Sequence, residues 1–307
     1  MSRIIEAKDL SKWYGQVIAV SKVSFALEAG VVGLLGPNGA GKSTLMKLMT
    51  GQLRPSQGQI TIQGENVWNN YSLFHRLGFC PEQDAFWERM SGAEFVASLL
   101  RLHGFPESEV KRRTSSALER VGLTSSGDKK IGAYSKGMRQ RVKMAQAIAH
   151  DPDILILDEP LSGMDPVARK ETIVLIREWG KQGKCVVVSS HILHEIEAMT
   201  QNIVLMHNGQ VLAEGDVHQI RDLIDKHPHN IYIRCREPRR LAEVLVGFPD
   251  VLSIRFHPDG DALTIESRKP DAFYERLPDL LLGHEIDLEE ITSPDDNLQA
   301  VFHYLVK

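Results

Sequence analysis

The sequence predicts an α/β protein in two parts: a large domain with a mostly parallel β-sheet, and a small α+β domain. Strand-sized apolar runs alternate with helical patterns along about the first 220 residues, which is typical of parallel sheets joined by helices. Residues 31–35 are continuously apolar, as in a strand that is buried on both faces. Beyond residue 230 the expected order is β-α-β-β-α-β, which is the ferredoxin-like arrangement.

The large domain begins with short strands and one helix. Residues 4–10 and 23–27 have strand patterns, and residues 31–35 lead through a glycine-rich turn into a helical pattern at 42–50. Residues 87–150 are mostly helical, with proline and glycine punctuation. The elements expected next are a strand at 154–157, a helix at 166–179, a strand at 185–189, a helix at 191–199 and a hairpin of 203–206 with 211–213.

A polar stretch at residues 225–230 marks a change of composition. We therefore predict a domain at 1–222, a linker at 223–229 and a small domain at 230–307. His227 and His229 have no third ligand nearby, so solvated loop histidines are favoured over a metal site. The elements expected in the small domain are strands at 231–236, 251–257, 262–267 and 286–291, and helices at 239–247, 271–282 and 297–306.

Composition and charge exclude several classes of protein. With 42% hydrophobic and 25% charged residues, the chain has the mix of an ordinary globular protein, and no window approaches the ~18 apolar residues that span a bilayer. Lys+Arg 36 against Asp+Glu 40 gives a net charge of -4, so no nucleic-acid partner is expected. Three scattered cysteines and a polar start indicate neither a disulfide framework nor a signal peptide, so we expect a cytoplasmic protein.

A phosphate-binding loop follows the apolar run at 31–35. Gly36-Pro-Asn-Gly-Ala-Gly-Lys-Ser43 fits the required pattern, with a strand before it and a helix after it. Glycines at 36, 39 and 41 let successive backbone N–H groups approach phosphate oxygens, and the helix N-terminus adds partial positive charge. Lys42 supplies a point charge for the outer phosphates, and the Ser43 hydroxyl can ligate Mg²⁺. The pattern therefore predicts nucleotide binding.

Two carboxylates follow the other buried strand, at residues 154–157. Asp158 and Glu159 emerge at the carboxyl end of that strand, where open α/β sheets place their ligands. We expect Asp158 to hold the Mg²⁺ shell. Glu159 is a candidate general base that deprotonates the attacking water.

With these two motifs, the sequence resembles the nucleotide-binding domain of ATP-binding-cassette (ABC) transporters. The resemblance spans about residues 4–222 and implies a parallel core sheet, an antiparallel β-subdomain and a helical subdomain at about 87–150. Tyr14 matches the aromatic residue that stacks on adenine in the family. Trp13 is an alternative for this role, because stacking needs only an aromatic face. Gln83 matches the glutamine loop, which approaches the Mg²⁺ and the attacking water and whose flank meets the membrane subunit.

Three further motifs carry the resemblance. Ser135 and Gly137 match the family signature, whose amides contact the γ-phosphate held by the other domain; Lys136 and Met138 depart from the usual pattern and resemble the type-two exporter branch. Asp165 matches the D-loop that crosses to the partner's site. His191 matches the switch histidine that touches the γ-phosphate; a zinc site with His194 lacks a third ligand.

The resemblance implies a complete set of site residues. Those expected to bind ATP are Tyr14, Gly36, Asn38, Gly39, Gly41, Lys42, Ser43 and Thr44. Those expected to act in catalysis are Glu159, His191 and Gln83, and those expected to hold Mg²⁺ are Ser43, Gln83 and Asp158.

Because the family's site joins the phosphate loop of one domain to the signature of another, this chain is expected to pair, as a homodimer or with a second ATPase subunit. The function implied is the ATPase subunit of an ABC transporter, driving separate membrane permease subunits from the cytoplasmic face of the cell membrane. Export is favoured by the signature variant and by residues 293–302, which resemble the ending common in the type-two class.

Other functions explain less of the sequence. A soluble ABC ATPase acting on nucleic acid or ribosomes is the alternative, but such proteins usually carry two cassettes or a long inserted coiled coil. A phosphate-loop GTPase or kinase leaves the signature, D-loop and switch histidine unexplained, and the guanine-binding Asn-Lys-x-Asp motif is absent. For the small domain, regulation, dimerisation and a simple packing extension all remain open.

Overall fold

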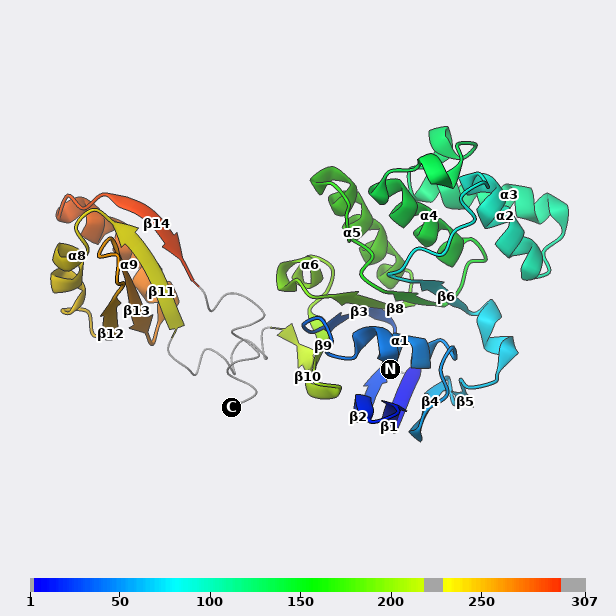
Figure 1. Ribbon diagram of the computed structural model, residues 1–307, viewed down its shortest axis with the longest axis horizontal. Helices are drawn as coiled ribbons and strands as arrows, with labels where there is room; N and C mark the ends of the chain where they lie inside the picture. The colour runs from blue at the N-terminus through cyan, green and yellow to red at the C-terminus, as the bar shows by residue number, and fades with distance from the viewer. Residues whose placement is uncertain (1–2, 218–228, 294–307) are drawn as a thin grey trace. The chain divides into compact units, whose positions relative to one another are not determined.

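The computed structural model describes residues 3–217 and 229–293, and the chain divides into two compact units, Met1–Asp216 and Val217–Lys307 (Figure 1). The first unit ends six residues before the predicted boundary at 222. Most of the predicted linker, and the predicted helix at 297–306, lie outside the described residues. Among the described residues, no helix is long and apolar enough to cross a membrane.

The first unit contains a six-stranded sheet in the order β10-β9-β3-β8-β7-β6. β3 pairs in parallel with β8 and β9, and β7 pairs in parallel with β6 and β8; only β10 is antiparallel. The predicted mostly parallel sheet and its closing hairpin are therefore confirmed. The strands are β3 (Gly30–Leu35), β6 (Leu77–Cys80), β7 (Ile154–Leu157), β8 (Cys185–Ser190), β9 (Asn202–His207) and β10 (Gln210–Asp216).

An antiparallel sheet in the order β2-β1-β4-β5 completes the β-structure of this unit. Its strands are β1 (Ile5–Tyr14), β2 (Val17–Leu27), β4 (Gln57–Ile62) and β5 (Glu65–Asn66). β1 runs four residues beyond its predicted end at Leu10. Register shifts against β2 interrupt the alternation of apolar and polar residues there, so the pattern hides a strand that continues to Tyr14.

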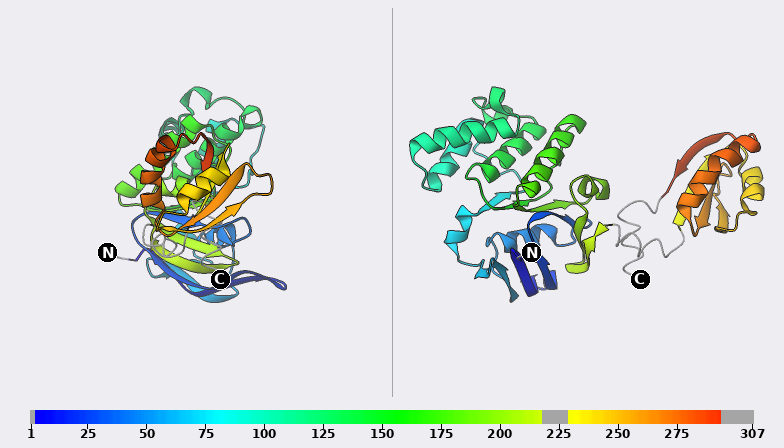
Figure 2. Two further views of the ribbon diagram at one scale, coloured as in Figure 1. Left: turned by 90° about the vertical axis from the view of Figure 1, so that its left-hand side faces the viewer. Right: turned by 180° about the vertical axis from the view of Figure 1, so that it is seen from behind.

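Helices cover the parallel sheet on both sides (Figures 1 and 2). The helices α2–α5 lie on one side, and α1 lies on the other, toward the antiparallel sheet. Side chains of α1 such as Leu45 and Met49 pack with Ile60 and Val187 in a core between the two sheets. The α-helices are α1 (Lys42–Met49), α2 (Gly92–Leu102), α3 (Glu107–Arg120), α4 (Lys136–Ile148), α5 (Pro166–Lys181) and α6 (Leu193–Glu197), with 3-10 turns η1 (Tyr71–His75), η2 (Thr124–Ser126) and η3 (Ile131–Ala133).

The prediction of a helix from His191 was wrong at its start. α6 spans only Leu193–Glu197, so His191 lies in the turn between β8 and the helix. The Ser190 hydroxyl accepts the Ile192 N–H at 3.0 Å and fixes an extended conformation before the helix begins. This turn presents His191 to the carboxyl end of the sheet.

The second unit is the predicted ferredoxin-like domain, with four antiparallel strands in the order β12-β13-β11-β14. α8 and α9 pack their apolar residues, such as Leu241 and Phe273, onto Ile231 and Ile265 of the sheet. The bounds are β11 (His229–Cys235), α8 (Pro238–Leu245), β12 (Val251–Phe256), β13 (Ala262–Ser267), α9 (Pro270–Gly283) and β14 (Leu288–Thr292). His229, expected as a solvated loop residue of the linker, is instead buried in β11.

Candidate active site

The phosphate loop connects β3 to α1, and two of its glycines are required by close backbone contacts. Gly41 has φ 101°, a conformation that residues with a side chain rarely adopt, and a Cβ there would overlap the carbonyl oxygen of Ala19. A Cβ at Gly36 would overlap the carbonyl oxygen of Met206. The loop is therefore held against both the β1–β2 hairpin and the parallel sheet.

Lys42, the first residue of α1, is buried beneath the loop. Its Nζ donates to the carbonyl oxygens of Gly36 at 2.6 Å and Pro37 at 3.2 Å, and it lies 3.8 Å from Glu159 Oε1. Burial lowers the pKa of Lys42, while the carboxylates of Glu159 and Asp158 oppose that shift. The ammonium group is thus placed where the α1 N-terminus and the end of β7 meet.

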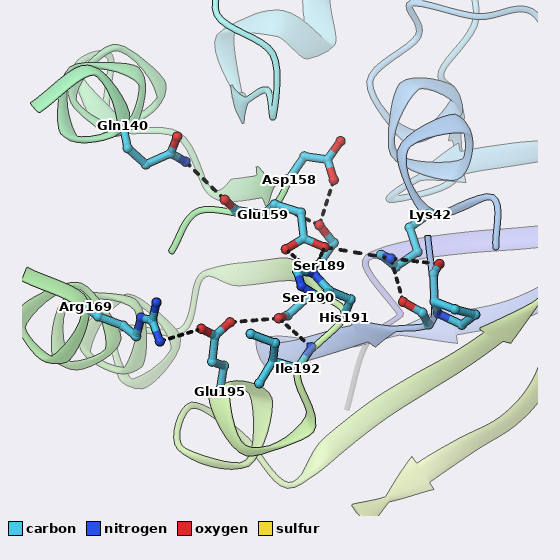
Figure 3. A network of polar contacts seen from close by, with 12 residues as sticks. Lys42, Gln140, Asp158, Glu159, Arg169, Ser189, Ser190, His191, Ile192 and Glu195 are labelled. Atoms are coloured by element: carbon cyan, nitrogen blue, oxygen red, sulfur yellow. Dashed lines mark hydrogen bonds and ion pairs between the residues drawn. The ribbon is translucent and has the colours of Figure 1, made fainter. Parts of the chain in front are cut away.

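Asp158 and Glu159 directly follow β7, and one serine hydroxyl at the end of β8 connects them. Ser189 Oγ donates to Asp158 Oδ1 at 2.7 Å and accepts the Glu159 N–H at 2.8 Å. The Gln140 side chain on α4 donates to the Glu159 carbonyl oxygen at 3.3 Å. These bonds hold Glu159 at φ 46°, in the left-handed region, so its carboxylate turns toward Lys42 (Figure 3).

His191 completes this cluster from the turn after β8. Its Nδ1 lies 3.1 Å from both carboxylate oxygens of Glu159. Burial raises the pKa of Glu159, and the hydrogen bond with His191 works against that rise. Lys42, Glu159 and His191 come from three elements and converge on one point, as Figure 3 shows.

The three predicted magnesium ligands line a single cavity of about 940 Å³, beside α1 and the end of β7. Ser43, Gln83 and Asp158 offer hydroxyl, amide and carboxylate oxygens, the hard donors that Mg²⁺ prefers. The residues therefore fit this ion. Among the residues that the structure describes, no group of three or more His, Cys, Asp or Glu side chains could hold a metal ion.

The segment around Gln83 is held in place by a hydrogen bond and an ion pair from α4. Lys143, buried on that helix, donates to the Glu82 carbonyl oxygen at 2.6 Å and forms an ion pair with Asp84 at 3.0 Å. Gln83 itself is exposed at the cavity. The loop is thus anchored on both sides of the residue that is expected to act.

The signature and the D-loop lie at two helix N-termini, apart from the Lys42 cluster. Ser135 caps α4 by accepting the Met138 N–H at 3.2 Å, and Asp165 caps α5 by accepting the Val167 and Ala168 N–H groups at 3.0 Å. The backbone N–H groups at Asp165 lower the pKa of its carboxyl. The side chain of Lys136 lies against Gly163, so the two exposed segments are neighbours.

The remaining predicted contacts to the nucleotide lie at the surface. Asn38 and Gly39 are exposed at the tip of the phosphate loop, and Thr44 is half-buried in α1. Tyr14 is exposed at the end of β1, on the hairpin that adjoins Gly41, and Trp13 before it is exposed as well. Both Tyr14 and Trp13 are therefore available near the loop to stack on adenine, and their positions do not distinguish between them.

Several site residues were not predicted from the sequence. They are Gln140, Arg169, Ser189, Ser190 and Glu195, all of which bond to predicted site residues or to one another. Ser189 and Ser190 could have been predicted as site residues from the sequence, because they end a buried strand just as Asp158 follows one. The other three are single polar residues within helices, and only the fold brings them to the site.

Comparison with known proteins agrees with this geometry. A family model described as ABC transporter matches residues 20–162. A solved structure described as the ATP-binding subunit of an ABC transporter superposes with a TM-score of 0.65 at 31% identity, covering 71% of this chain and 92% of that one. The bacitracin transport ATP-binding protein BcrA of Bacillus licheniformis is 30% identical over 309 residues, covering 100% of this chain and 98% of that protein. The chain belongs to the ABC transporter ATP-binding family.

This ABC ATPase has the α/β cassette of its family and is the ATP-binding subunit of a transporter. The similarity to BcrA runs through the ferredoxin-like unit as well as the cassette. The linearmycin resistance ATP-binding protein LnrL of Bacillus subtilis is 32% identical over 214 residues, covering 69% of each chain. The predicted family, fold and enzyme class are thereby confirmed.

Proposed function

We propose that two copies of this ABC ATPase close around MgATP and couple its hydrolysis to separate membrane permease subunits, in export. The observation that carries the proposal is the convergence of Lys42, Glu159 and His191. Lys42 Nζ lies 3.8 Å from the Glu159 carboxylate, and His191 Nδ1 lies 3.1 Å from the same group. A phosphate-binding cation, a buried base and a histidine at one point are the parts that phosphoryl transfer to water needs.

Binding of the phosphates falls to the loop and to α1. Backbone N–H groups of the loop and the α1 N-terminus attract the anionic oxygens, and the Lys42 ammonium neutralises the outer ones. Lys42 now donates to the Gly36 and Pro37 carbonyl oxygens, so it exchanges these bonds for phosphate oxygens when ATP binds. Mg²⁺, held by Ser43, Asp158 and Gln83, would neutralise phosphate charge and orient the chain of phosphates.

Activation of water falls to Glu159. As water attacks the γ-phosphorus, its proton passes to the Glu159 carboxylate, the bond to the ADP oxygen breaks, and ADP and phosphate leave. Burial raises the pKa of Glu159, which makes it a stronger proton acceptor than an exposed glutamate. His191 Nδ1 contacts both carboxylate oxygens of Glu159, which supports a role in keeping that carboxylate oriented. In the proposed mechanism the imidazole also donates toward the γ-phosphate.

The exposed signature and D-loop support a site that a second copy completes. Within their own chain, Ser135 and Asp165 bond to the first turns of α4 and α5 and act as helix caps. The N-terminus of α4 has no acidic residue in its first turn. Its backbone N–H groups and partial positive charge can therefore attract an anion from outside the helix. In a two-fold dimer each copy offers this end to the ATP of the other.

Mixing two inactive variants tests the shared site. Lys42→Ala disables one phosphate loop, and Ser135→Tyr blocks one signature. Each variant alone is expected to be inactive, whereas a heterodimer keeps one site with both parts intact. Equal mixing is expected to restore about a quarter of the wild-type rate of phosphate release, since about half of the dimers are mixed and each has one good site. A mixture as inactive as its components contradicts the shared site.

An apolar cavity beside Gln83 supports a membrane partner. The 940 Å³ cavity extends from Ser43 and Asp158 to an exposed rim of large apolar side chains. Those side chains are Tyr71, Phe74, Trp87 and Leu102. Exposed apolar surface of this kind marks an interaction site, and its continuity with Gln83 would let a bound permease segment affect catalysis.

The direction of transport is inferred from the relatives. BcrA is named for bacitracin transport and LnrL for linearmycin resistance, and both names fit removal of a toxic compound. We extend export to this chain, on the cytoplasmic face of the membrane, where ATP is supplied. Purification of the tagged full chain from membranes tests this. A co-purifying protein with many spans supports the proposal, whereas recovery of RNA or ribosomes favours the alternative of an ABC ATPase without a permease.

A further inference from the structure

A buried carboxylate lies close behind the turn that carries His191. Glu195 on α6 is only 5% exposed. Its Oε2 accepts a hydrogen bond from the Ser190 hydroxyl at 2.8 Å, and its Oε1 forms an ion pair with Arg169 Nη1 at 3.3 Å (Figure 3). A buried carboxylate is costly unless it is paired and hydrogen-bonded, so Glu195 depends on both partners.

The Ser190 hydroxyl makes two hydrogen bonds to residues that follow His191. It donates to Glu195 and accepts the Ile192 N–H at 3.0 Å. The hydroxyl therefore closes a local turn with His191 at its centre, and the buried carboxylate fixes the direction of the hydroxyl hydrogen. The ring of His191 is itself about half exposed, so packing alone does not orient it. The backbone of His191 is instead oriented by the turn that the Ser190 hydroxyl closes.

Arg169 connects the turn to α5. It lies one helical turn after Asp165, and its backbone N–H donates to the Asp165 carbonyl oxygen at 2.9 Å. Its Nε–H is buried and has no hydrogen-bond partner among the described residues. Buried N–H groups without an acceptor are rare in native proteins. A small rotation of the guanidinium toward Glu195 would satisfy this group and replace one long contact with a two-bond pair.

We infer that Arg169 and Glu195 are positioning residues for ATP hydrolysis. Through Ser190 they hold the turn that places His191 against Glu159, and they connect that turn to the end of α5 that bears Asp165. The inference rests on the proposed function in one respect, the participation of His191 in hydrolysis. Because Asp165 faces the second copy in the proposed dimer, a movement of this end of α5 reaches the His191 turn through the Arg169–Glu195 ion pair and the Ser190 hydroxyl.

Steady-state hydrolysis by the full chain gives the first test. Arg169→Met and Glu195→Gln are expected to lower kcat by about ten- to a hundredfold while KM for ATP changes by less than about twofold, because the nucleotide contacts remain. Arg169→Lys is expected to recover most of kcat. The control is Glu171→Gln, on α5 like Arg169, which breaks the exposed 2.9 Å ion pair of Glu171 with Arg141 of α4 and is expected to leave kcat unchanged. A rise in KM with kcat unchanged contradicts the inference.

A double-mutant cycle tests whether the effect passes through His191. In a His191→Ala background, Arg169→Met is expected to lower kcat further by less than about twofold, since the residue that it positions is gone. The melting temperatures of all variants are measured alongside. If Arg169→Met costs as much in the His191→Ala background as in the wild type, Arg169 acts elsewhere and the inference is wrong.

Hydrogen exchange gives a readout that does not depend on activity. Loss of Arg169 or replacement of Glu195 is expected to speed amide exchange in residues 190–196 by about tenfold, with exchange in β3 unchanged. Unchanged exchange in this segment overturns the inference even if kcat falls. If His191→Ala hydrolyses ATP like the wild type, the catalytic assignment of His191 fails, while the exchange of residues 190–196 still decides whether the ion pair holds the turn.

Discussion

Glu159 is held in a conformation that few residues with side chains adopt. Its backbone φ of 46° is stabilised by the Ser189 hydroxyl, which bonds its N–H, and by Gln140, which bonds its carbonyl oxygen. Strain of this kind is found at functional sites where the surroundings over-determine the backbone. The result is a carboxylate aimed at Lys42 and His191, in a place where burial raises its pKa.

Replacement of this carboxylate should separate binding from chemistry. Glu159→Gln keeps the shape and the hydrogen bond to His191 but cannot take a proton, so hydrolysis should slow by about 10²- to 10⁴-fold. MgATP binding should persist, and an ATP-bound dimer should accumulate. Phosphate release and light scattering after chromatography measure the two effects, with Glu171→Gln as control. Normal turnover by Glu159→Gln would place the general base elsewhere.

Replacement of Lys42 should act on binding itself. Lys42→Ala removes the buried ammonium that neutralises the outer phosphates, so MgATP affinity should fall beyond detection in a titration with a fluorescent nucleotide. Lys170→Ala, at an exposed position of α5, is the control. Tight binding by Lys42→Ala would remove the phosphate-loop assignment.

At the scale of elements, the helical subdomain is joined to the sheet by a stack of histidines. His103 caps the end of α2, and His150 follows α4; their rings stack 4.3 Å apart at an angle of 17°. His150 Nε2 lies 3.1 Å from the Leu77 carbonyl oxygen in β6. Burial lowers the pKa of His150 to about 4, and the neighbouring His103 adds to that effect.

This arrangement predicts acid sensitivity of the cassette. His150 stays neutral in the folded state down to about pH 4, whereas in the unfolded chain it takes up a proton near pH 6.5. The unfolded state therefore binds more protons between these values, and stability falls as pH drops through the window, by about 3 kcal/mol at most from this residue. Urea unfolding of the full chain at pH 7 and pH 4.5 measures the fall. His150→Phe should show a smaller fall; an equal one contradicts the assignment.

Elements and motifs differ in how far the sequence could predict them. The phosphate loop, Asp158 and Glu159 were predictable because local pattern and strand context define them. The partners Arg169 and Glu195 were not, because their meeting depends on how α5 and α6 pack, which no local pattern encodes. The bulged end of β1 and the burial of His229 were missed for the related reason that pairing across a sheet overrides local polarity.

At the scale of the whole molecule, the proposed dimer predicts an effect in trans. A substitution at Ser135 should lower turnover much more than ATP binding by a single copy, because in the proposed dimer the serine would contact the nucleotide of the partner. Ser135→Tyr compared with Ser135→Thr, which preserves the cap on α4, separates this role from helix stability. Equal losses in nucleotide binding and turnover by Ser135→Tyr would place Ser135 in the site of its own chain.

The close approach of Gly41 to Ala19 has a consequence for how ATP is recognised. Because the phosphate loop and the β1–β2 hairpin touch backbone to backbone, no side chain can be inserted between them, and the distance between the phosphate end and the aromatic end of the site is fixed in advance. In the proposed site, with adenine stacked on the hairpin aromatic, the cassette would therefore select a nucleotide by its length as well as by its charge. Enlarging residue 41 should weaken triphosphate binding and adenine selectivity together, as one coupled loss.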